Sequence, residues 1–590
     1  NYEGGAIQSI TSYEPIDADF RPAYRDGWNF GGWYKDAACT DGQEADLSVA
    51  GTYYAKWVET AHDAFAYVFA SDNTGFVIDD TVGELTADLV LPESHLGLPV
   101  VEIAAGGATS PTIAAAAYER VVIPGTIRTI GNYAFIGSTF GAIEFGEGVE
   151  SIGNYAFARA NATSRLSRDE NNNYAVSDPV APVTFPSSLR SIGTHAFLWT
   201  PLSAVTFNEG LESIGNYAFA GYTATNANVA GVTEAIFQPF TEVHFPSTLK
   251  SIGDQAFWLN KLEKVTFADG CLLDSMGQYA FGGNSWTTGQ KKDFQIPIKY
   301  AELPGFSDPD DEDNATLKYI FQNCTSLEEV VFKGPVHRIG TASFKNCTAL
   351  GTVEGKPFVL PEGVTYLYNA FENTRFTSIT IPNTLEDAST SLNTTFEYNT
   401  ALETVVFEEG SQVSELNGTF QGCTALKNVT LPDGLTEIAG NVFKGCTALT
   451  EVVLTNPDAV VSITSTTFNG CDQLITVTVP DALLGQYARD EIWGDPIQFA
   501  LTWTNENLGH NVTFNYGGKG TDNTALYVVG ETVILPQPDL WLDNETSTEY
   551  VLTGWYTDEN FETPLDASVP VGDADITLYF LLLDLLEGAS

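Results

Sequence analysis

The chain has 590 residues, 43% hydrophobic and 12% aromatic, which is enough apolar material for several buried cores and excludes a disordered chain. Its 76 acidic and 26 basic residues give a formal net charge of -50, so nucleic acid and anionic membrane surfaces are excluded as partners. No apolar run of about 18 residues predicts a membrane span. The chain opens at Asn1 without a signal-peptide pattern, and we expect that a leader has been removed from an exported protein.

Residues 1–60 carry a pattern rich in glycine and aromatic residues. The run DGWNFGGWYKDAACT begins at Asp26, and GTYYAKW ends at Trp57. These motifs resemble the Listeria-Bacteroides repeat, a small β-grasp-like module of cell-wall proteins. The resemblance implies that residues 1–60 form a partial module of this kind, which serves as a spacer or an accessory binding unit.

Residues 111–480 contain thirteen copies of an Ile-Gly-x-x-Ala-Phe motif or a weaker relative, mostly about 22 to 27 residues apart. Longer gaps before Phe197, Phe257 and Phe321 predict loops inserted into an otherwise constant coil. The copies end at Phe135, Phe157, Phe197, Phe219, Phe257, Phe281, Phe321, Phe344, Phe371, Phe396, Phe420, Phe443 and Phe468. A repeat of this length predicts one coil of a solenoid per copy.

Each copy also contains a short apolar alternation, such as VVIP from Val121 or VTLP from Val429. This alternation predicts a β-strand with two side chains inward and one outward, ended by proline. Stacked in parallel about 4.8 Å apart, thirteen strands make one sheet on the order of 60 Å long. Each buried Phe, Ile or Leu contributes roughly 1.5 to 3 kcal/mol. The pattern therefore predicts a mainly β repeat protein with a parallel β-sheet and a cap at each end.

The run ALKNVTLPDGLTEIAGNVFKGCTALTEVVL, from Ala425 to Leu454, fits L-x-x-I-x-L-P-x-x-L-x-x-I-G-x-x-A-F-x-x-C. It resembles the BspA-like leucine-rich repeat, and the resemblance extends from Val100 to Pro480. It implies a leucine-rich-repeat solenoid whose N-terminal cap lies in residues 61–110. The protein is thereby expected to be extracellular or on a bacterial cell surface.

The C-terminal part of the chain is expected to contain a second cap and a second module. The run VPDALLGQYARDEIW, from Val479 to Trp493, resembles the end of such solenoids and predicts a short helix in a cap over residues 481–508. Residues 509–590 carry VTFNYGG, LTGWYTDENF and ITLYF and resemble a second Listeria-Bacteroides-type module.

Five cysteines follow a repeat phenylalanine by three residues: Cys324, Cys347, Cys423, Cys446 and Cys471. A metal or redox ladder would need paired C-x-x-C or nearby histidines, which are lacking. Side chains of one column point the same way, which disfavours disulfides. We interpret these cysteines as buried thiols that act as small hydrophobic residues.

No fingerprint of a catalytic or cofactor site occurs, and the six histidines are scattered, so we expect no enzyme activity and no cofactor. The densest acidic run, SDPDDEDNAT from Ser307, is a weak candidate for a calcium loop through Asp308, Asp310, Asp311, Glu312 and Asp313. It lacks the EF-hand glycine and bidentate glutamate, and a merely solvated acidic loop is the alternative.

Two columns are candidate binding surfaces. The outward strand positions are almost all β-branched, which suits either a flat ligand platform or simply a strand. These positions are Val122, Glu144, Thr184, Thr206, His244, Thr266, Val331, Val359, Thr380, Val406, Thr430, Val453 and Thr478. The second column consists of Tyr133, Tyr155, His195, Tyr217 and Tyr279. Its rings either stack on sugars or protein side chains, or fill the shoulder between coils.

The three insertions, about 158–182, 221–238 and 282–314, are the other candidate surface, because loops of this length are often functional. Trp286 with Lys291 and Lys292 makes the third the sharpest candidate in a chain so poor in positive charge.

Taken together, these features predict a non-enzymatic binding or adhesion protein that acts as a monomer and recognises an extracellular protein or glycan. The alternative is a passive stalk or spacer of the cell envelope without a specific ligand.

Overall fold

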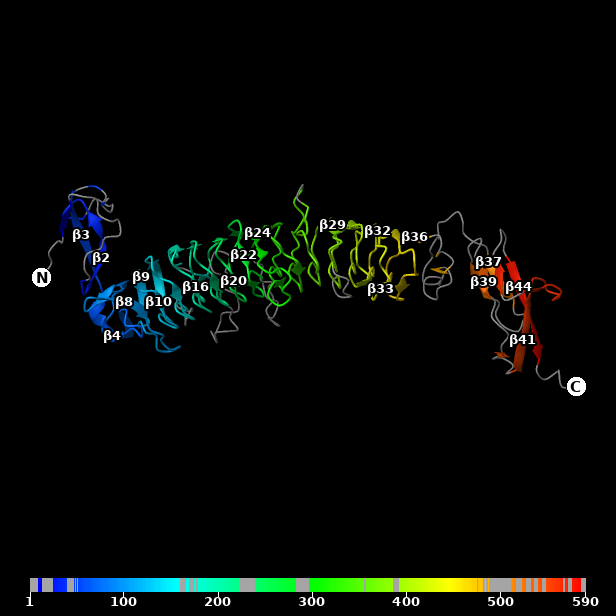
Figure 1. Cartoon of the computed structure of the whole chain (residues 1–590), viewed down its shortest axis with the longest axis horizontal. Coiled ribbons are helices and arrows are strands. Elements are labelled where there is room, and N and C mark those ends of the chain that lie inside the picture. Colours follow the sequence, from blue (N-terminus) through cyan, green and yellow to red (C-terminus); the bar gives the residue numbers. More distant parts are fainter. Residues whose placement is uncertain are drawn as a thin grey trace. The chain divides into compact units, whose positions relative to one another are not determined.

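The computed structural model describes residues 9–12, 25–39, 47, 49, 51–159, 166–168, 174–176, 179–221, 239–282, 297–354, 357–385, 392–474, 476–480, 483, 486–487, 511–515, 523–526, 532–534, 540–543, 548–565, 568–570 and 576–584. The chain forms two compact units. The first comprises residues 1–356 with 361–363, and the second comprises residues 357–360 with 364–590. In the first unit, coils follow one another from β9 to β24 (Figure 1).

A typical coil of the first unit contains two short strands. One is a Ser-Ile strand that pairs in parallel and in register with the next coil, as Ser151 with Ser191 and Ile152 with Ile192. Its isoleucine points inward, and Ile152 is buried. The glycine that follows is required by packing, because a Cβ at Gly193 would lie 2.7 Å from backbone atoms of the preceding coil.

These short strands build the longest sheet of the described chain, which has ten strands. In order across the sheet they are β23 (Ser275–Met276), β20 (Ser251–Ile252), β18 (Ser213–Ile214), β16 (Ser191–Ile192), β12 (Ser151–Ile152), β10 (Thr129–Ile130), β8 (Leu98–Ile103), β5 (Phe76–Thr81) and β4 (Phe65–Phe69), with β7 (Ser94–His95) beside β8. The antiparallel strand β4 closes the N-terminal end, and the 3-10 turn η1 (His62–Ala64) precedes it.

The Val-x-Phe strands lie on the other side of each coil and form separate sheets. In the first unit these are β11 (Thr139–Phe145), β9 (Ala117–Ile123) and β6 (Asp88–Val90); β15 (Val183–Thr184) with β17 (Val205–Thr206); and β19 (Glu242–Phe245), β21 (Lys264–Phe267), β24 (Tyr300–Leu303) and β27 (Glu329–Phe332). Smaller pairs are β13 (Leu166–Arg168) with β14 (Tyr174–Val176), β22 (Leu272–Leu273) with β25 (Gly305–Phe306), and β26 (Thr316–Leu317) with β28 (Arg338–Ile339). The expectation of one continuous thirteen-rung sheet was therefore wrong.

In the second unit, two coil faces again carry short parallel strands. One face has β29 (Ser378–Ile381) with β30 (Thr404–Phe407), and β32 (Asn428–Thr430), β34 (Glu451–Val453) and β36 (Thr476–Thr478). The other has β31 (Glu415–Asn417), β33 (Glu437–Ala439) and β35 (Ser462–Ile463). Val359, which we expected at an outward strand position, lies outside any strand and is 68% exposed.

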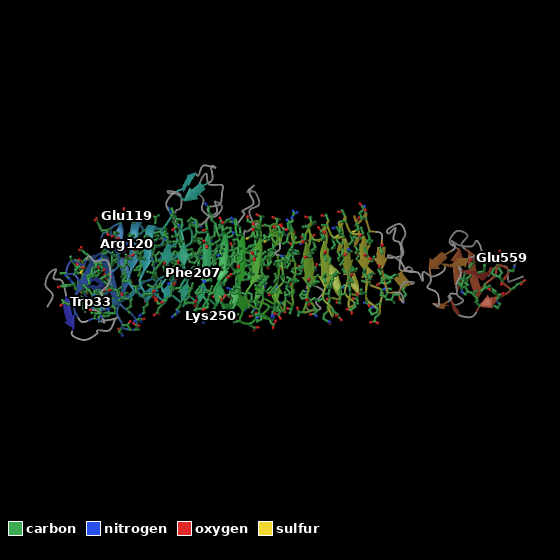
Figure 2. All side chains as sticks on the ribbon, turned by 90° about the horizontal axis from the view of Figure 1, so that it is seen from above. Trp33, Glu119, Arg120, Phe207, Lys250 and Glu559 are labelled. Carbon is green, nitrogen blue, oxygen red and sulfur yellow. The ribbon has the colours of Figure 1, made fainter. Side chains whose placement is uncertain are left out.

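The repeat phenylalanines form the core. Phe135, Phe157, Phe197 and Phe219 are fully buried, and neighbouring rings stack with centroids 5.0 to 5.3 Å apart. Rings of the opposite strand, such as Phe207, meet this column edge-on, at 5.6 Å from Phe219 (Figure 2). In the second unit Phe396, Phe420 and Phe443 stack in the same way. Offset and edge-on aromatic pairs add about 0.5 to 1.5 kcal/mol each to the burial of the rings.

The repeat pattern in the sequence did not predict one of the coils. Strand β24 pairs with β21 and β27, and Glu302 lies in register with Val331. Its sequence, Tyr-Ala-Glu-Leu, lacks the Val-x-Phe alternation, so we had assigned it to an insertion over 282–314. The described chain returns to the solenoid at residue 297, and Ile298 is already fully buried. The third insertion is therefore shorter than predicted.

Each terminal module has its own sheet. In the N-terminal module β3 (Gly51–Glu59) pairs antiparallel with β1 (Ser9–Ser12) and β2 (Trp28–Tyr34), over a core of Trp33, Leu47, Tyr53 and Ala55. The C-terminal module contains β38 (Asn523–Leu526), β37 (Asn511–Asn515), β44 (Ile576–Asp584), β41 (Thr548–Tyr556) and β40 (Leu540–Asp543), with β42 (Pro564–Leu565) beside β41. A pair, β39 (Thr532–Ile534) with β43 (Ser568–Pro570), completes it.

The predicted helix over 479–493 lies mostly outside the described residues. Two apolar residues of this run, Leu483 and Tyr487, are described, and both are buried. The Tyr487 hydroxyl accepts a hydrogen bond of 2.9 Å from the Val461 amide, which ties this segment to the last coils. Within the described chain, no helix is long and apolar enough to cross a membrane.

Candidate functional site

The predicted aromatic column forms, and its rings stack on one another. Tyr133 lies 5.0 Å from Tyr155, Tyr155 lies 4.4 Å from His195, and His195 lies 4.9 Å from Tyr217, with planes within 6°. Tyr279 stacks separately on Tyr319 at 4.6 Å. Both faces of Tyr155 and His195 are therefore covered by neighbouring rings. A sugar ring needs a free aromatic face, so this geometry favours the packing role that was the alternative.

The backbone explains why the rings align. Each residue follows the Gly and polar position after a Ser-Ile strand, and each has positive φ, 59° at Tyr133, 56° at Tyr155 and 58° at His195. The polar side chains one position earlier form a parallel ladder, in which Asn132 Oδ1 accepts from the Asn154 amide and Asn154 Oδ1 accepts from the Thr194 amide, both at 2.7 Å. The repeated turn thus presents every ring in the same orientation.

Burial disfavours a charge on three rings of this column, Tyr155, His195 and Tyr217. Burial lowers the pKa of His195, and it raises the pKa values of Tyr155 and Tyr217. In the described chain, His195 Nδ1 is buried and has no hydrogen-bond partner. A protonated His195 would therefore place an unsatisfied cationic N–H inside the stack, which disfavours the charged form.

The scarce cations are used to pair neighbouring coils. Lys250 lies 2.7 Å from Glu212, Lys299 lies 2.8 Å from Glu263, and in the second unit Lys427 lies 2.7 Å from Glu403. The residues that precede the Ser-Ile strands alternate in sign along six successive coils: Arg128, Glu150, Arg190, Glu212, Lys250 and Asp274. Exposed ion pairs contribute only about 0 to 1 kcal/mol each to stability. The alternation in sign places opposite charges on neighbouring coils, and this favours the observed order of coils over one that brings like charges together. Lys250 is labelled in Figure 2.

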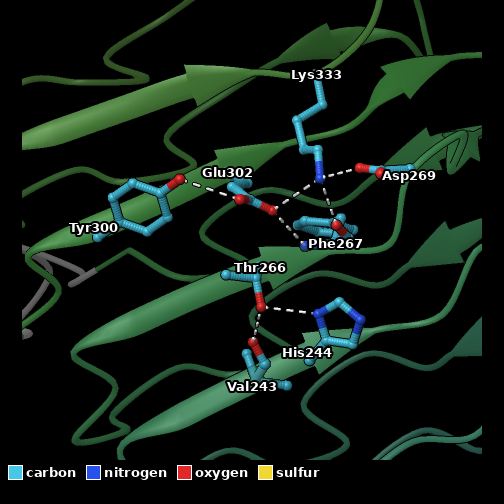
Figure 3. A network of polar contacts seen from close by, with 8 residues as sticks. All are labelled: Val243, His244, Thr266, Phe267, Asp269, Tyr300, Glu302 and Lys333. Atoms are coloured by element: carbon cyan, nitrogen blue, oxygen red, sulfur yellow. Dashed lines mark hydrogen bonds and ion pairs between the residues drawn. The ribbon is translucent and has the colours of Figure 1, made fainter.

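A polar network crosses the sheet formed by β19, β21, β24 and β27 (Figure 3). The Glu302 carboxylate accepts from the Phe267 amide at 3.1 Å and from the Tyr300 hydroxyl at 3.1 Å, and Lys333 Nζ lies 3.4 Å away. Lys333 Nζ also donates to the Phe267 carbonyl at 3.1 Å and pairs with Asp269 at 2.5 Å. Both peptide groups of Phe267 are thereby satisfied by side chains from the next two coils.

The neighbouring outward position on the same sheet is also engaged. His244 Nδ1 lies 2.9 Å from Thr266 Oγ1, and Thr266 Oγ1 donates to the Val243 carbonyl at 3.2 Å (Figure 3). The polar groups of this face thus bond mainly to the coils themselves. The pairing of β21 with β24 ends at Val265 and Ala301, and the network bonds the peptide groups of Phe267 beyond that point, so we assign it an architectural role.

The acidic loop folds onto the coil that follows it. Asp310 lies 2.8 Å from His337 Nδ1, and Glu312 lies 3.6 Å from Arg338. The Asp311 carboxylate accepts from the Asn314 side-chain and backbone N–H groups and from the Asp313 amide, and these bonds lower its pKa. Within the described chain, this loop included, no three His, Cys, Asp or Glu side chains form a group that could hold a metal ion. The structure thus gives no geometric support for the candidate calcium loop from Asp308 to Asp313.

In most coils the residue three positions after the repeat phenylalanine has a side chain that can donate a hydrogen bond. Cys446 Sγ lies 3.2 Å from the Phe420 carbonyl of the preceding coil, and Cys423 lies at the same distance from the Phe396 carbonyl. In other coils Thr200 and Asn260 make the equivalent bonds, to Phe157 and Phe219. The predicted burial of the five thiols is confirmed, and all are free. They act as donors as well as small hydrophobic residues, which the spacing alone did not reveal.

The remaining candidates, Trp286, Lys291 and Lys292, lie outside the described residues. The structure does describe where the three insertions leave the solenoid. They follow Phe157, Phe219 and Phe281, which stand 62 residues apart. Up to that point the chain remains bonded to the next coil, as when the Arg159 amide donates to Leu198 and the Gly221 amide to Trp258. Each insertion therefore starts from the same position of every second coil.

Sequence reasoning missed a second set of groups. His62 and His95, taken as scattered histidines, face each other with His62 Nε2 2.9 Å from His95 Nδ1. They are 33 residues apart, and no local motif connects them. Only the return of the chain from β5 through the β7–β8 hairpin brings them together.

Comparison with known proteins agrees with this architecture. The model of the BspA type leucine rich repeat region matches residues 114–226, 170–287, 315–417 and 392–488, which together exceed half of the chain. The model of the Listeria-Bacteroides repeat domain matches residues 2–56 and 510–579. No curated protein matches the sequence.

Several solved structures are similar in fold. A leucine-rich repeat protein from Bacteroides ovatus is 19% identical over 75% of this chain and 99% of its own, with a TM-score of 0.41. A leucine rich cell surface protein from Faecalibacterium prausnitzii is 17% identical over 70% and 93%, with a TM-score of 0.29. The pneumococcal vaccine antigen PcpA is 16% identical over 75% and 98%, with a TM-score of 0.33. At these values the likeness concerns the fold alone. The extent of the family-model match and the observed stack of coils show that the chain belongs to the BspA-type leucine-rich-repeat proteins, with a Listeria-Bacteroides repeat domain at each end.

Proposed function

We propose that the protein lies on a bacterial cell surface or in the extracellular space and that its solenoid holds binding loops for an extracellular protein or glycan. Its family supports this location, because the chain combines BspA-type repeats with Listeria-Bacteroides repeat domains, and the latter resemble modules of cell-wall proteins. The generally non-enzymatic character of leucine-rich-repeat proteins supports binding over catalysis. In the described chain the aromatic column and several polar groups bond between coils, which favours the insertions over these groups as the surface for recognition.

The observation that carries the proposal is the regular placement of the insertions. Three segments leave the same position of every second coil, after Phe157, Phe219 and Phe281. Coils stacked about 4.8 Å apart separate neighbouring insertions by about 10 Å along one edge of the solenoid. A rigid scaffold that repeats a loop at constant spacing is suited to recognition, since loops on rigid supports commonly carry binding residues.

The third insertion is the most specific part of the proposal. Trp286 offers an aromatic anchor, and Lys291 with Lys292 offers local positive charge in a chain with only 26 basic residues against 76 acidic ones. Aromatic and cationic side chains are the types that most often dominate the energy of an interface. We expect these three residues to contact the partner.

The test is a binding screen of the full chain against arrays of extracellular-matrix proteins and glycans. A variant with residues 283–296 replaced by a short Gly-Ser linker is compared with variants in which residues 160–178 or 222–238 are replaced in the same way. Loss of binding at least tenfold in the first variant supports the proposal. Retention of binding in all three contradicts a role for the insertions, and absence of any binding favours the passive stalk.

A further inference from the structure

The N-terminal module is anchored to the solenoid through one hairpin. Asn29 Nδ2 donates to the Leu91 carbonyl, and Asn29 Oδ1 accepts from the Glu93 amide, both at 2.7 Å. The Asp26 carboxylate accepts from the amides of Leu96 and Gly97, at 2.9 and 3.2 Å. These two amides form the turn between β7 and β8, directly after His95. The position of this turn therefore decides whether Asp26 can hold it.

A pair of histidines fixes the same turn from the other side. His62 Nε2 lies 2.9 Å from His95 Nδ1, and His62 Nδ1 lies 2.9 Å from Asp63 Oδ1. The His95 ring stacks on Tyr67, with centroids 4.0 Å apart and planes 12° apart, and the Phe76 ring meets it edge-on at 4.7 Å. The imidazole pair thus joins the turn to the segment that leads from the module into β4.

The facing nitrogens accept only one proton between them. With Asp63 accepting from His62 Nδ1, the His62 Nε2 lone pair accepts from His95 Nδ1–H. One added proton still leaves a donor facing an acceptor, because the ring that remains neutral can take the tautomer that turns a lone pair toward its partner. A second added proton places two N–H groups and two positive charges 2.9 Å apart, which removes the hydrogen bond and adds repulsion.

We propose that the His62–His95 pair is an acid-sensitive latch whose double protonation releases the β7–β8 turn and loosens the attachment of the N-terminal module. The groups that face the pair set the order of events. Asp63 and Asp26 are carboxylates and favour the first proton, so the latch stays closed on mild acidification. The Tyr67 hydroxyl donates to the His62 carbonyl at 2.8 Å, and burial raises its pKa, so it stays neutral.

Burial and the neighbouring His62 lower the pKa of His95, with Asp26 opposing, which agrees with a second proton that is bound only in acid. Because the closed pair binds this proton less readily than free histidine, the open form gains protons as the pH falls below about 6.5. Acid therefore favours opening, and return to neutral pH restores the latch.

The first measurement is hydrogen exchange of the full chain, followed by mass spectrometry at pH 7.5 and 4.5 and corrected for intrinsic rates. We expect peptides covering residues 91–98 to lose at least tenfold protection at pH 4.5, while peptides of the ten-stranded sheet at residues 191–214 keep theirs. The variant His62→Gln retains an acceptor toward His95 and cannot be protonated. It is expected to keep the protection of residues 91–98 at pH 4.5.

The matched control is His244→Gln, which changes an exposed histidine bonded to Thr266 and should open in acid as the natural chain does. A second readout does not depend on a folded variant. In the natural chain labelled at histidine Cε1, the signals of His62 and His95 should titrate in two steps and share both midpoints. Unchanged protection at pH 4.5, equal opening of His62→Gln, or independent single-step titration of the two histidines would each overturn the latch.

Discussion

Replacing Phe219 by alanine tests whether the phenylalanine column is the main source of cohesion between coils. The ring is fully buried and stacks at 5.3 Å on both Phe197 and Phe257. A buried Phe→Ala change costs about 3 to 5 kcal/mol, through lost burial and the cavity that remains. Phe219→Leu keeps most of the burial and loses the aromatic pairs, so we expect it to cost less, about 1.5 kcal/mol.

A chain of this length need not unfold in one step, so the cost is best measured coil by coil with hydrogen exchange. The amides to follow are Phe219, which donates to Ala256, and Phe197, which donates to Ala218. A cost of about 3 to 5 kcal/mol lowers their protection by roughly two to three and a half powers of ten. The matched change Phe443→Ala in the second unit should affect its own coils. Unchanged protection around Phe219, or equal losses in both units, would refute column packing between nearest neighbours.

Three further changes address the columns separately. His195→Tyr places at this position the tyrosine found in the neighbouring coils. Burial lowers the pKa of His195, so the unfolded chain binds a proton at this residue more tightly than the folded chain does. The natural chain is therefore expected to lose stability as the pH falls below about 6.5, and the variant is expected to lose less. Thermal melts at pH 7.5 and 5 measure this, and equal losses contradict it. Cys446→Ala leaves the Phe420 carbonyl without its donor and should cost about 1 to 3 kcal/mol, whereas Cys446→Ser keeps a donor and should cost less, as denaturant melts will measure. Glu302→Ala removes the acceptor of the Phe267 amide, and we expect a loss of stability similar to that of Cys446→Ala. Hydrogen exchange at the Phe267 amide measures this loss. Unaltered exchange would argue against the network.

The repeat motif was sufficient to predict the solenoid, because the residues that recur most faithfully are those that pack. The repeat phenylalanines and isoleucines, such as Phe135, Phe157 and Ile152, are buried for the same steric reason. Their spacing in the sequence therefore gives the length of one coil. The same logic predicted the burial of Cys446 and its column. The pattern failed at β24, where Ala301 and Glu302 replace the Val-x-Phe alternation, since the neighbouring strands β21 and β27 supply the register there.

The candidate sites were less predictable than the coils. Four of the five rings of the predicted tyrosine column stack on one another, but whether the rings face solvent or each other depends on the positive φ at Tyr155 and His195, which a motif does not specify. The acidic loop was a weak calcium candidate with a solvated loop as the alternative, and the structure adds that Asp310 and Glu312 lie beside His337 and Arg338 of the following coil. Which side chains meet across coils depends on how the coils stack. The sequence alone therefore did not decide between the binding role and the packing role of these residues.

The sequence by itself determined the period, the identity of the buried columns and the coils at which the three insertions begin, because each coil repeats one local pattern. Only the tertiary structure decided which polar groups meet across coils. The pairing of His62 with His95 and the bonds from Glu302 and Lys333 to Phe267 arise from neighbours distant in the chain. A local pattern specifies which residues a coil needs for packing, whereas contacts between coils depend on which coil becomes the neighbour.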